Sequence, residues 1–212
     1  MYHGGVTPPS RAEESGTKSG RRAELLDLAA SLFAERGMRA TTVRDIADAA
    51  GILSGSLYHH FDSKESMVDE ILRGFLDELF GRYRTITESG LGARATLEAL
   101  VIASFEAIDS SHPAVAIYQD EAKHLVGNER FAYIGDRNRE FRTLWVSVLE
   151  SGIADGSFRP DIDVELVYRF MRDTVWVAVR WYRPGGPMTA ETVAKQYLAI
   201  VLDGLSSPQS RP

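Results

Sequence analysis

Residues 42–61 read TVRDIADAAGILSGSLYHHF, and this stretch decides how the N-terminal part of the chain folds. Thr42 begins a short helix, with Asp45 three residues later as its capping-box partner. Gly51 ends that helix in a turn of about four residues, and Ser54 is placed to cap a second, very short helix. Two short helices joined in this way are typical of a helix-turn-helix, which binds DNA.

The second short helix is expected to present a small polar face. A helix this short has to be held by packing, so we expect the i, i+4 pair Leu57 and Phe61 to be buried. At about 100° per residue, this arrangement points Gly55, Ser56 and His59 outward. Such a face suits a helix in the major groove, where Gly55 allows close approach and Ser56 reaches base edges.

Phosphate contacts are expected around this face. Tyr58 and His59 can donate hydrogen bonds to phosphates. Thr41 and Thr42 offer hydroxyl and N–H groups at a helix N-terminus. Lys64 stands in the first turn of the next helix, where a cation is unfavourable unless an anion lies beside it. The expected DNA contacts are Thr41, Thr42, Arg44, Ser54, Gly55, Ser56, Tyr58, His59 and Lys64.

The rest of the chain also shows helical spacing. A helix is expected over about 22–36, followed by Gly37, and a long helix is expected to start at Asp62, which caps it with Glu65. Five further helices are expected over about 93–110, 113–126, 128–155, 164–183 and 190–205. No strand pattern competes, so the predicted fold class is all-α, with about nine helices. The predicted organisation is a disordered tail (1–20), a DNA-binding domain (21–64), a ligand-binding and dimerisation domain (65–205) and a flexible end (206–212).

Composition and charge limit the possible classes of protein. The 212 residues are 44% hydrophobic and contain no cysteine, which excludes disulfides and thiolate metal sites. There is no apolar run long enough to span a membrane and no secretory signal, so we expect a cytoplasmic protein. Residues 1–64 carry eight basic and eight acidic side chains, so the net charge of −6 comes from residues 65–212. A protein that is acidic overall is a poor general binder of nucleic acid, but the neutral N-terminal part leaves room for a local binding face.

Residues 25–72 closely resemble the DNA-binding domain of the TetR family of bacterial repressors. The matching features are LF-x-x-x-G, T-T-V-x-D-I-A, A-G-I-x-x-G-x-L-Y-x-H-F and the K-E that opens the long helix. The resemblance implies three N-terminal helices for DNA and a larger helical body for a ligand. It also implies a homodimer through the last two helices, bound to a palindromic operator.

The segment 164–183, VELVYRFMRDTVWVAVRWYR, is apolar nearly all round. Such a helix is expected to be buried on two sides, with one side on its own core and the other on a partner chain. A monomer with a central core helix is the alternative. The residues expected at the dimer interface are Val175, Val179, Tyr197 and Val201.

Arg172 is the main candidate for a ligand contact. It has no carboxylate three or four residues away, and a buried guanidinium needs an anion or other acceptors. Either a ligand or a carboxylate on another helix could supply it. Trp176, one turn later, offers a flat apolar wall. The expected ligand-binding residues are Arg172, Trp176, Tyr168, Arg180, Phe75 and Tyr118.

A narrower resemblance covers the C-terminal part. The stretches IYQDEAKHL, F-x-Y-I-x-D-R-N-R and LVYRFMRDTVWVAVRWYRPGGPMTAE look like the KstR-like repressors of cholesterol catabolism in actinobacteria. Among these, they look like the type that governs genes for the last two steroid rings. This resemblance implies an effector that is a CoA thioester of a two-ring propanoate, and no cofactor.

Two other classes of function remain open from the residues alone. One is an all-α enzyme whose metal site uses Asp120, Glu121 and His124, since Glu-x-x-His is a metal spacing in bundles. The chain has only one such motif, and a solvated helix face is the simpler interpretation. We therefore predict no metal site and no enzymatic activity. The other class is a helical protein that uses its helix-turn-helix for protein contacts.

Overall fold

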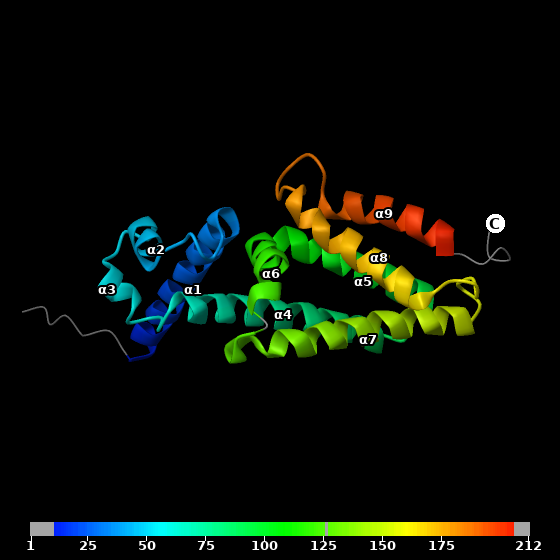
Figure 1. Ribbon diagram of the computed structural model, residues 1–212, viewed down its shortest axis with the longest axis horizontal. Coiled ribbons are helices and arrows are strands. Elements are labelled where there is room, and N and C mark those ends of the chain that lie inside the picture. The colour runs from blue at the N-terminus through cyan, green and yellow to red at the C-terminus, as the bar shows by residue number, and fades with distance from the viewer. Residues whose placement is uncertain (1–10, 126, 206–212) are drawn as a thin grey trace, which may run out of the picture. The chain divides into compact units, whose positions relative to one another are not determined.

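The computed structural model describes residues 11–125 and 127–205, which contain helices and no strand. The all-α prediction is therefore confirmed (Figure 1). The helices are α1 (Arg11–Arg36), α2 (Val43–Ala49), α3 (Ser54–Leu57), α4 (Lys64–Glu88), α5 (Ala93–Ser110), α6 (His112–Leu125), η1 (Glu129–Phe131), α7 (Tyr133–Ala154), α8 (Val164–Val177), η2 (Ala178–Arg180) and α9 (Ala190–Leu205). Over the same residues, no helix has the length and apolar character needed to cross a membrane.

The chain forms two compact units, and the boundary between them falls inside α4, between Ile71 and Leu72. This boundary lies later than the expected one at 64/65. The first turns of α4 belong to the N-terminal unit because Glu70 forms an ion pair with Arg22 of α1. α4 is therefore one continuous helix that contributes to both units.

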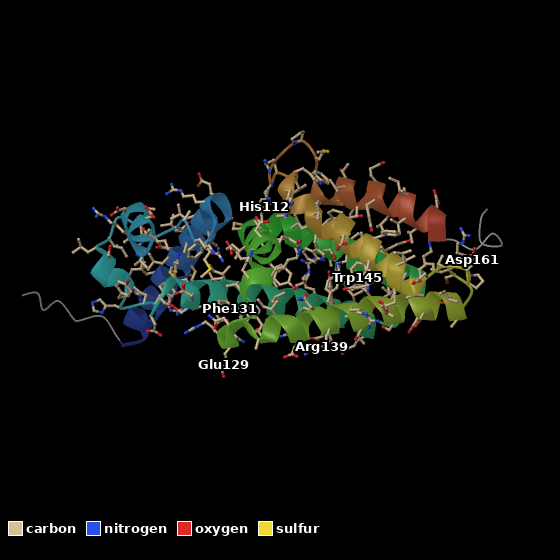
Figure 2. The ribbon with its side chains drawn as sticks, viewed as in Figure 1. His112, Glu129, Phe131, Arg139, Trp145 and Asp161 are labelled. Atoms are coloured by element: carbon tan, nitrogen blue, oxygen red, sulfur yellow. The ribbon has the colours of Figure 1, made fainter. Side chains whose placement is uncertain are left out.

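The larger unit is built around α5, which contacts α6, α7, α8 and α9 (Figure 1). An aromatic cluster lies in the interior of this unit. The ring of Phe141 stacks on that of Trp145 with 5.4 Å between ring centres, and the ring centre of Tyr83 lies 5.7 Å from that of Phe141. Trp145 is labelled in Figure 2 and is 1% exposed. The Tyr83 hydroxyl lies 2.5 Å from the Ser104 hydroxyl, which donates to the Leu100 carbonyl oxygen.

The N-terminal helix is longer than expected. It starts at Arg11 rather than near Arg22, so residues 11–20, assigned to the disordered tail, are helical. Extending an existing helix adds a hydrogen bond per residue without a new nucleus. The remaining parts of the two predicted tails, 1–10 and 206–212, lie outside the described residues. Gly37 follows α1 with φ 83°, a conformation that favours glycine.

The helix caps agree with the sequence in one case of three. Thr42 and Asp45 form the predicted capping box of α2. Ser54 does not cap α3: the N-cap residue is Leu53, which makes no side-chain capping bond. Asp62 does not cap α4 either, because Ser63 and Ser66 exchange side-chain to backbone bonds at its start. The Ser63 hydroxyl accepts from the N–H of Ser66, and the Ser66 hydroxyl accepts from the N–H of Ser63.

The last predicted helix but one divides into two parts. α8 ends at Val177 and continues as the 3-10 helix η2 through Arg180, rather than as one α-helix to Arg183. His112 of α6 lies with its Nε2 3.0 Å from the carbonyl oxygen of Val179. This contact gives the Val179 carbonyl group a hydrogen-bond partner at the point where the α-helix changes into a 3-10 helix.

Candidate functional sites

The surface of α3 agrees with the face expected from the sequence. Leu57 and Phe61 are buried, at 1% and 4% exposure. Gly55, Ser56, Tyr58 and His59 are exposed. The small, polar outer face that a major groove requires is therefore present on this helix.

Thr41 is not part of that surface. The sequence prediction made it a phosphate contact, but its side chain is fully buried. Its hydroxyl donates to the carbonyl oxygen of Gly37 at 2.9 Å and lies 3.3 Å from that of Leu32. Thr41 closes the turn that follows Gly37, since its N–H also donates to the Gly37 carbonyl. A buried hydroxyl in that position cannot reach DNA.

Lys64 has partners inside the protein. Its ammonium group donates hydrogen bonds to the carbonyl oxygens of Met38 at 2.8 Å and Thr41 at 3.1 Å. A phosphate was expected beside Lys64 because a cation at a helix N-terminus is unfavourable next to the positive end of the helix dipole. The two carbonyl oxygens stabilise this cation within the chain instead.

Two other residues expected to contact DNA, Thr42 and Arg44, have partners within the chain. The N–H of Thr42 donates to the Asp45 carboxylate at 2.7 Å, and its hydroxyl donates to the same oxygen at 2.5 Å. These bonds from Thr42 lower the pKa of Asp45. Arg44 is exposed and lies 3.7 Å from Asp48, a surface ion pair that leaves most of its donors available. Ser54 is half-buried.

A second candidate site is an apolar cavity in the larger unit. Its volume is about 20 Å³, and the pocket is partly open to solvent. Its lining residues are Phe75, Leu76, Leu79, Phe80, Tyr118, Arg137, Phe141 and Trp176. Three of the six expected ligand-binding residues are thus brought together here: Phe75, Tyr118 and Trp176. Phe75 meets the Trp176 ring edge-on at 6.2 Å.

Arg137 and Phe141 were missed by the sequence analysis. Arg137 is the one charged side chain among the described residues that line the cavity. Its guanidinium donates to Asp77 of α4 at 2.5 Å and to Glu140 at 2.8 Å, and it lies 5.0 Å from the centre of the Phe80 ring. The Glu140 carboxylate raises the pKa of Arg137. The run F-x-Y-I-x-D-R-N-R contains this residue, but no spacing in it shows that Arg137 faces a cavity.

Tyr118, which is half-buried, contributes a hydroxyl to the cavity wall. It donates a hydrogen bond of 2.5 Å to the side-chain oxygen of Asn138 on α7. Burial raises the pKa of Tyr118 to about 12, so the phenol is neutral at physiological pH. The wall therefore combines flat apolar rings with one neutral hydroxyl and one guanidinium.

The premise for Arg172 was wrong. Its side chain is 44% exposed, and its Nε donates to the neighbouring Asp173 at 2.7 Å. That carboxylate raises the pKa of Arg172. Carboxylates three or four residues away are the usual partners on a helix, but a long arginine side chain also reaches the next residue. Arg180 is also exposed, with Asp120 at 3.4 Å, and Tyr168 is buried beside Phe141.

Two of the residues expected at the dimer interface, Val175 and Val179, belong to the core of the single chain. Both are buried inside their own chain, at 1% and 4% exposure. Tyr197 packs on Phe105 with 5.9 Å between ring centres, and Val201 is half-buried. The apolar side chains that α8, its extension and α9 leave exposed are Leu166, Phe170, Val177, Trp181 and Ile200.

The metal-site alternative gains no support from the geometry. Across residues 11–125 and 127–205, no group of three or more His, Asp or Glu side chains is placed to hold a metal ion. Asp120 is instead paired with Arg180, and His124 is exposed.

The comparison with known families identifies the class of protein. Residues 25–71 match the "Bacterial regulatory proteins, tetR family", and residues 90–205 match the "Tetracyclin repressor-like, C-terminal domain". The chain belongs to the TetR family: it is a transcriptional repressor with a DNA-binding helix-turn-helix, and not an enzyme.

Within the family, the chain is similar to repressors named KstR2. It is 76% identical over 205 residues to the "HTH-type transcriptional repressor KstR2" of Rhodococcus jostii, covering 97% of this chain and 100% of the relative. The KstR2 of Mycobacterium tuberculosis is 65% identical over 192 residues, covering 91% and 96%.

Solved structures give the same result. The structure of the "ketosteroid transcriptional regulator KstR2 of Mycobacterium tuberculosis" has a TM-score of 0.87 at 66% identity, covering 88% of this chain and 95% of the other. A chain of AibR in complex with isovaleryl coenzyme A and operator DNA has a TM-score of 0.75 at 22% identity, covering 85% and 97%. At that identity, the AibR likeness shows the fold alone.

Proposed function

We propose that this protein represses genes of steroid-ring catabolism and leaves its operator when it binds the CoA thioester of a steroid-ring fragment. The observation that carries the proposal is the 76% identity to a KstR2 repressor over 97% of the chain. The related structure from Mycobacterium tuberculosis is described as a ketosteroid transcriptional regulator. Such similarity supports control of the same class of genes and a response to the same class of effector. It also supports a cytoplasmic location for this protein.

The cavity supports an effector with a flat apolar part. Its walls are the rings of Phe75, Phe141 and Trp176, which offer large apolar surfaces to fused carbon rings. Arg137 supplies donors for a carbonyl or phosphate oxygen. The free volume is far below that of a CoA thioester, so binding requires the walls to separate.

This requirement suggests how an effector changes DNA binding. A ligand that fits only the opened cavity shifts the population toward that state. α4 carries Phe75 at the cavity and Asp77 bonded to Arg137, and its first turns belong to the N-terminal unit. Movement of α4 in the opened state would change the spacing of two DNA-reading heads, which must lie about 34–36 Å apart, or a multiple of that, to read two half-sites.

The proposal includes a homodimer that binds a palindromic operator. The exposed apolar side chains of Phe170, Val177 and Trp181 supply a surface that a second copy can cover. An apolar face of this kind on the last helices fits an isologous contact between two copies.

A different acyl-CoA or other hydrophobic effector is the second candidate. The small free volume favours a shorter acyl group, and AibR is described in complex with isovaleryl coenzyme A. The acyl chain of such an effector would fill the cavity with less separation of its walls.

The test is a thermal-shift screen followed by operator release. The screen compares CoA thioesters of two-ring steroid fragments with isovaleryl-CoA, free CoA and the free acids. A ligand at 100 times its dissociation constant should stabilise the native state by about 2.7 kcal/mol. The steroid-fragment thioester should give the largest shift and release a labelled operator. A larger shift and release with isovaleryl-CoA would favour the second candidate, and no effect from any thioester would contradict a CoA-thioester effector of either kind.

A further inference from the structure

Leu53 occupies an unusual position for an apolar residue. It is the N-cap residue of α3, with extended backbone angles of φ −73° and ψ 143°, and it makes no side-chain capping bond. Leucine is among the residues least favoured there, because it has no oxygen to accept from the first-turn N–H groups. Its side chain is also 80% exposed. The α3 helix therefore lacks a side-chain cap at this position, and an apolar side chain is exposed to solvent there.

Exposure alone does not distinguish Leu53, because single exposed leucines are common on protein surfaces. Its neighbours distinguish it. The N–H of Ser56 donates to the Leu53 carbonyl oxygen at 2.8 Å, so these two residues lie one turn apart at the same end of α3. Gly55 and Ser56 are exposed at this end as well. In a helix-turn-helix, the N-terminal residues of the second helix contact base edges.

An apolar side chain at this place has one matching feature in the major groove. Base edges there present hydrogen-bond donors and acceptors, except for the C5-methyl group of thymine. A leucine cannot satisfy a donor or acceptor, and covering one would leave it unpaired. Leu53 therefore fits beside a thymine methyl group rather than against a polar base edge.

We infer that Leu53 reads the methyl group of a thymine in the operator and is a specificity-determining residue of this repressor. The inference rests on the DNA-binding class of the protein and does not depend on the effector. It adds an apolar contact to the polar contacts expected from Ser56. The absence of a cap at α3 is then the consequence of using the N-cap position for base recognition.

The test removes one methyl group at a time from the DNA. An operator is first selected from a random-sequence duplex library with the full-length protein. Each thymine is then replaced by deoxyuridine, which keeps the pairing and the O4 acceptor and lacks only the C5-methyl group. One replacement should weaken binding by the wild-type protein about fourfold, the factor for losing one buried methyl group.

Leu53→Ser and Leu53→Ala should abolish the difference between thymine and deoxyuridine at that position. Leu53→Ser restores a capping oxygen, so its melting temperature should not fall. Leu91→Ser is the matched control, because Leu91 is 50% exposed and lies in the larger unit. This control should keep the wild-type response to deoxyuridine.

Three outcomes would overturn the inference. The first is a wild-type protein that responds to no deoxyuridine replacement. The second is an unchanged response in the Leu53 variants. The third is unfolding of both Leu53 variants, because a side chain needed for folding is not free to read DNA.

Discussion

The ammonium group of Lys64 donates a 2.8 Å hydrogen bond to the carbonyl oxygen of Met38, which lies 26 residues earlier in the chain. A second bond goes to the carbonyl oxygen of Thr41 at 3.1 Å. Lys64 opens α4, and its two acceptors lie between α1 and α2. One cation thus joins the start of α4 to the loop between α1 and α2, where the helix-turn-helix begins.

Lys64→Met should destabilise the protein by about 1–2 kcal/mol, since it removes the donor and keeps most of the aliphatic side chain. The salt dependence of operator binding should stay close to wild type. Urea unfolding and operator affinity at several salt concentrations measure the two effects. Arg44→Met is the control, and its exposed guanidinium should lower the salt slope. Unchanged stability with a salt slope reduced by about one would make Lys64 a phosphate contact instead.

Tyr58 and Ser56 should affect DNA binding in different ways. Tyr58→Phe removes one hydroxyl from a side chain that is 56% exposed, and we expect equally weaker binding to all sequences. Ser56→Ala should change the preferred base at one position of each half-site. Affinities for a set of single-base operator variants distinguish the two patterns. A changed base preference in Tyr58→Phe would mean that α3 lies in the groove in another orientation.

Dimer formation should depend on the exposed face of α8. Phe170→Glu places a charge where the side chain is 63% exposed in the single chain, so the protein should fold and sediment as a monomer. Its operator affinity should fall, because one short helix reads too few bases. Val179→Glu should instead misfold, since Val179 lies in the core at 4% exposure. An exposed serine on α7 provides a control through Ser147→Glu, which should remain dimeric. A folded, dimeric Phe170→Glu protein would place the interface elsewhere.

Arg137→Met should weaken the effector response while operator binding is retained. The change removes the one guanidinium in the cavity lining and keeps an apolar side chain of similar length. Arg139→Met is the matched control: Arg139 is on the same helix, paired with Asp136 on the outer edge of α7 (Figure 2). Operator release across a range of thioester concentrations should need more ligand only for Arg137→Met. Equal responses of the two variants would remove Arg137 from the binding site.

Arg172→Met should leave stability nearly unchanged. Its ion pair with Asp173 is exposed, and such pairs contribute about 0–1 kcal/mol. This differs from a buried ion pair, whose loss would destabilise the protein strongly. Thermal unfolding and effector release measured on the same variant separate structure from ligand binding. A wild-type response to the effector would exclude a ligand role for Arg172, and a large loss of stability would show that its partners are more extensive than Asp173.

Residue spacing along the chain was enough to predict the local elements of this protein. The i, i+4 pair Leu57 and Phe61 and the Thr42–Asp45 capping box lie as their spacing predicts, because helical geometry brings residues three or four apart into contact. The all-α class followed from the same periodicity. The motifs of residues 25–72 also indicated the family, since a helix-turn-helix is a local unit.

Which side chains are available for binding depends on how the helices pack together. Lys64 and Thr41 were expected to meet phosphates, but they bond to carbonyl groups of residues that are distant in sequence or that lie across a turn. Val175 and Phe170 are both apolar residues of α8, and only packing against the rest of the chain buries the first and exposes the second. Arg137 faces the cavity because α4 and α7 meet there. Burial and charge pairing depend on neighbours from other helices, and helical periodicity along one segment contains no information about them.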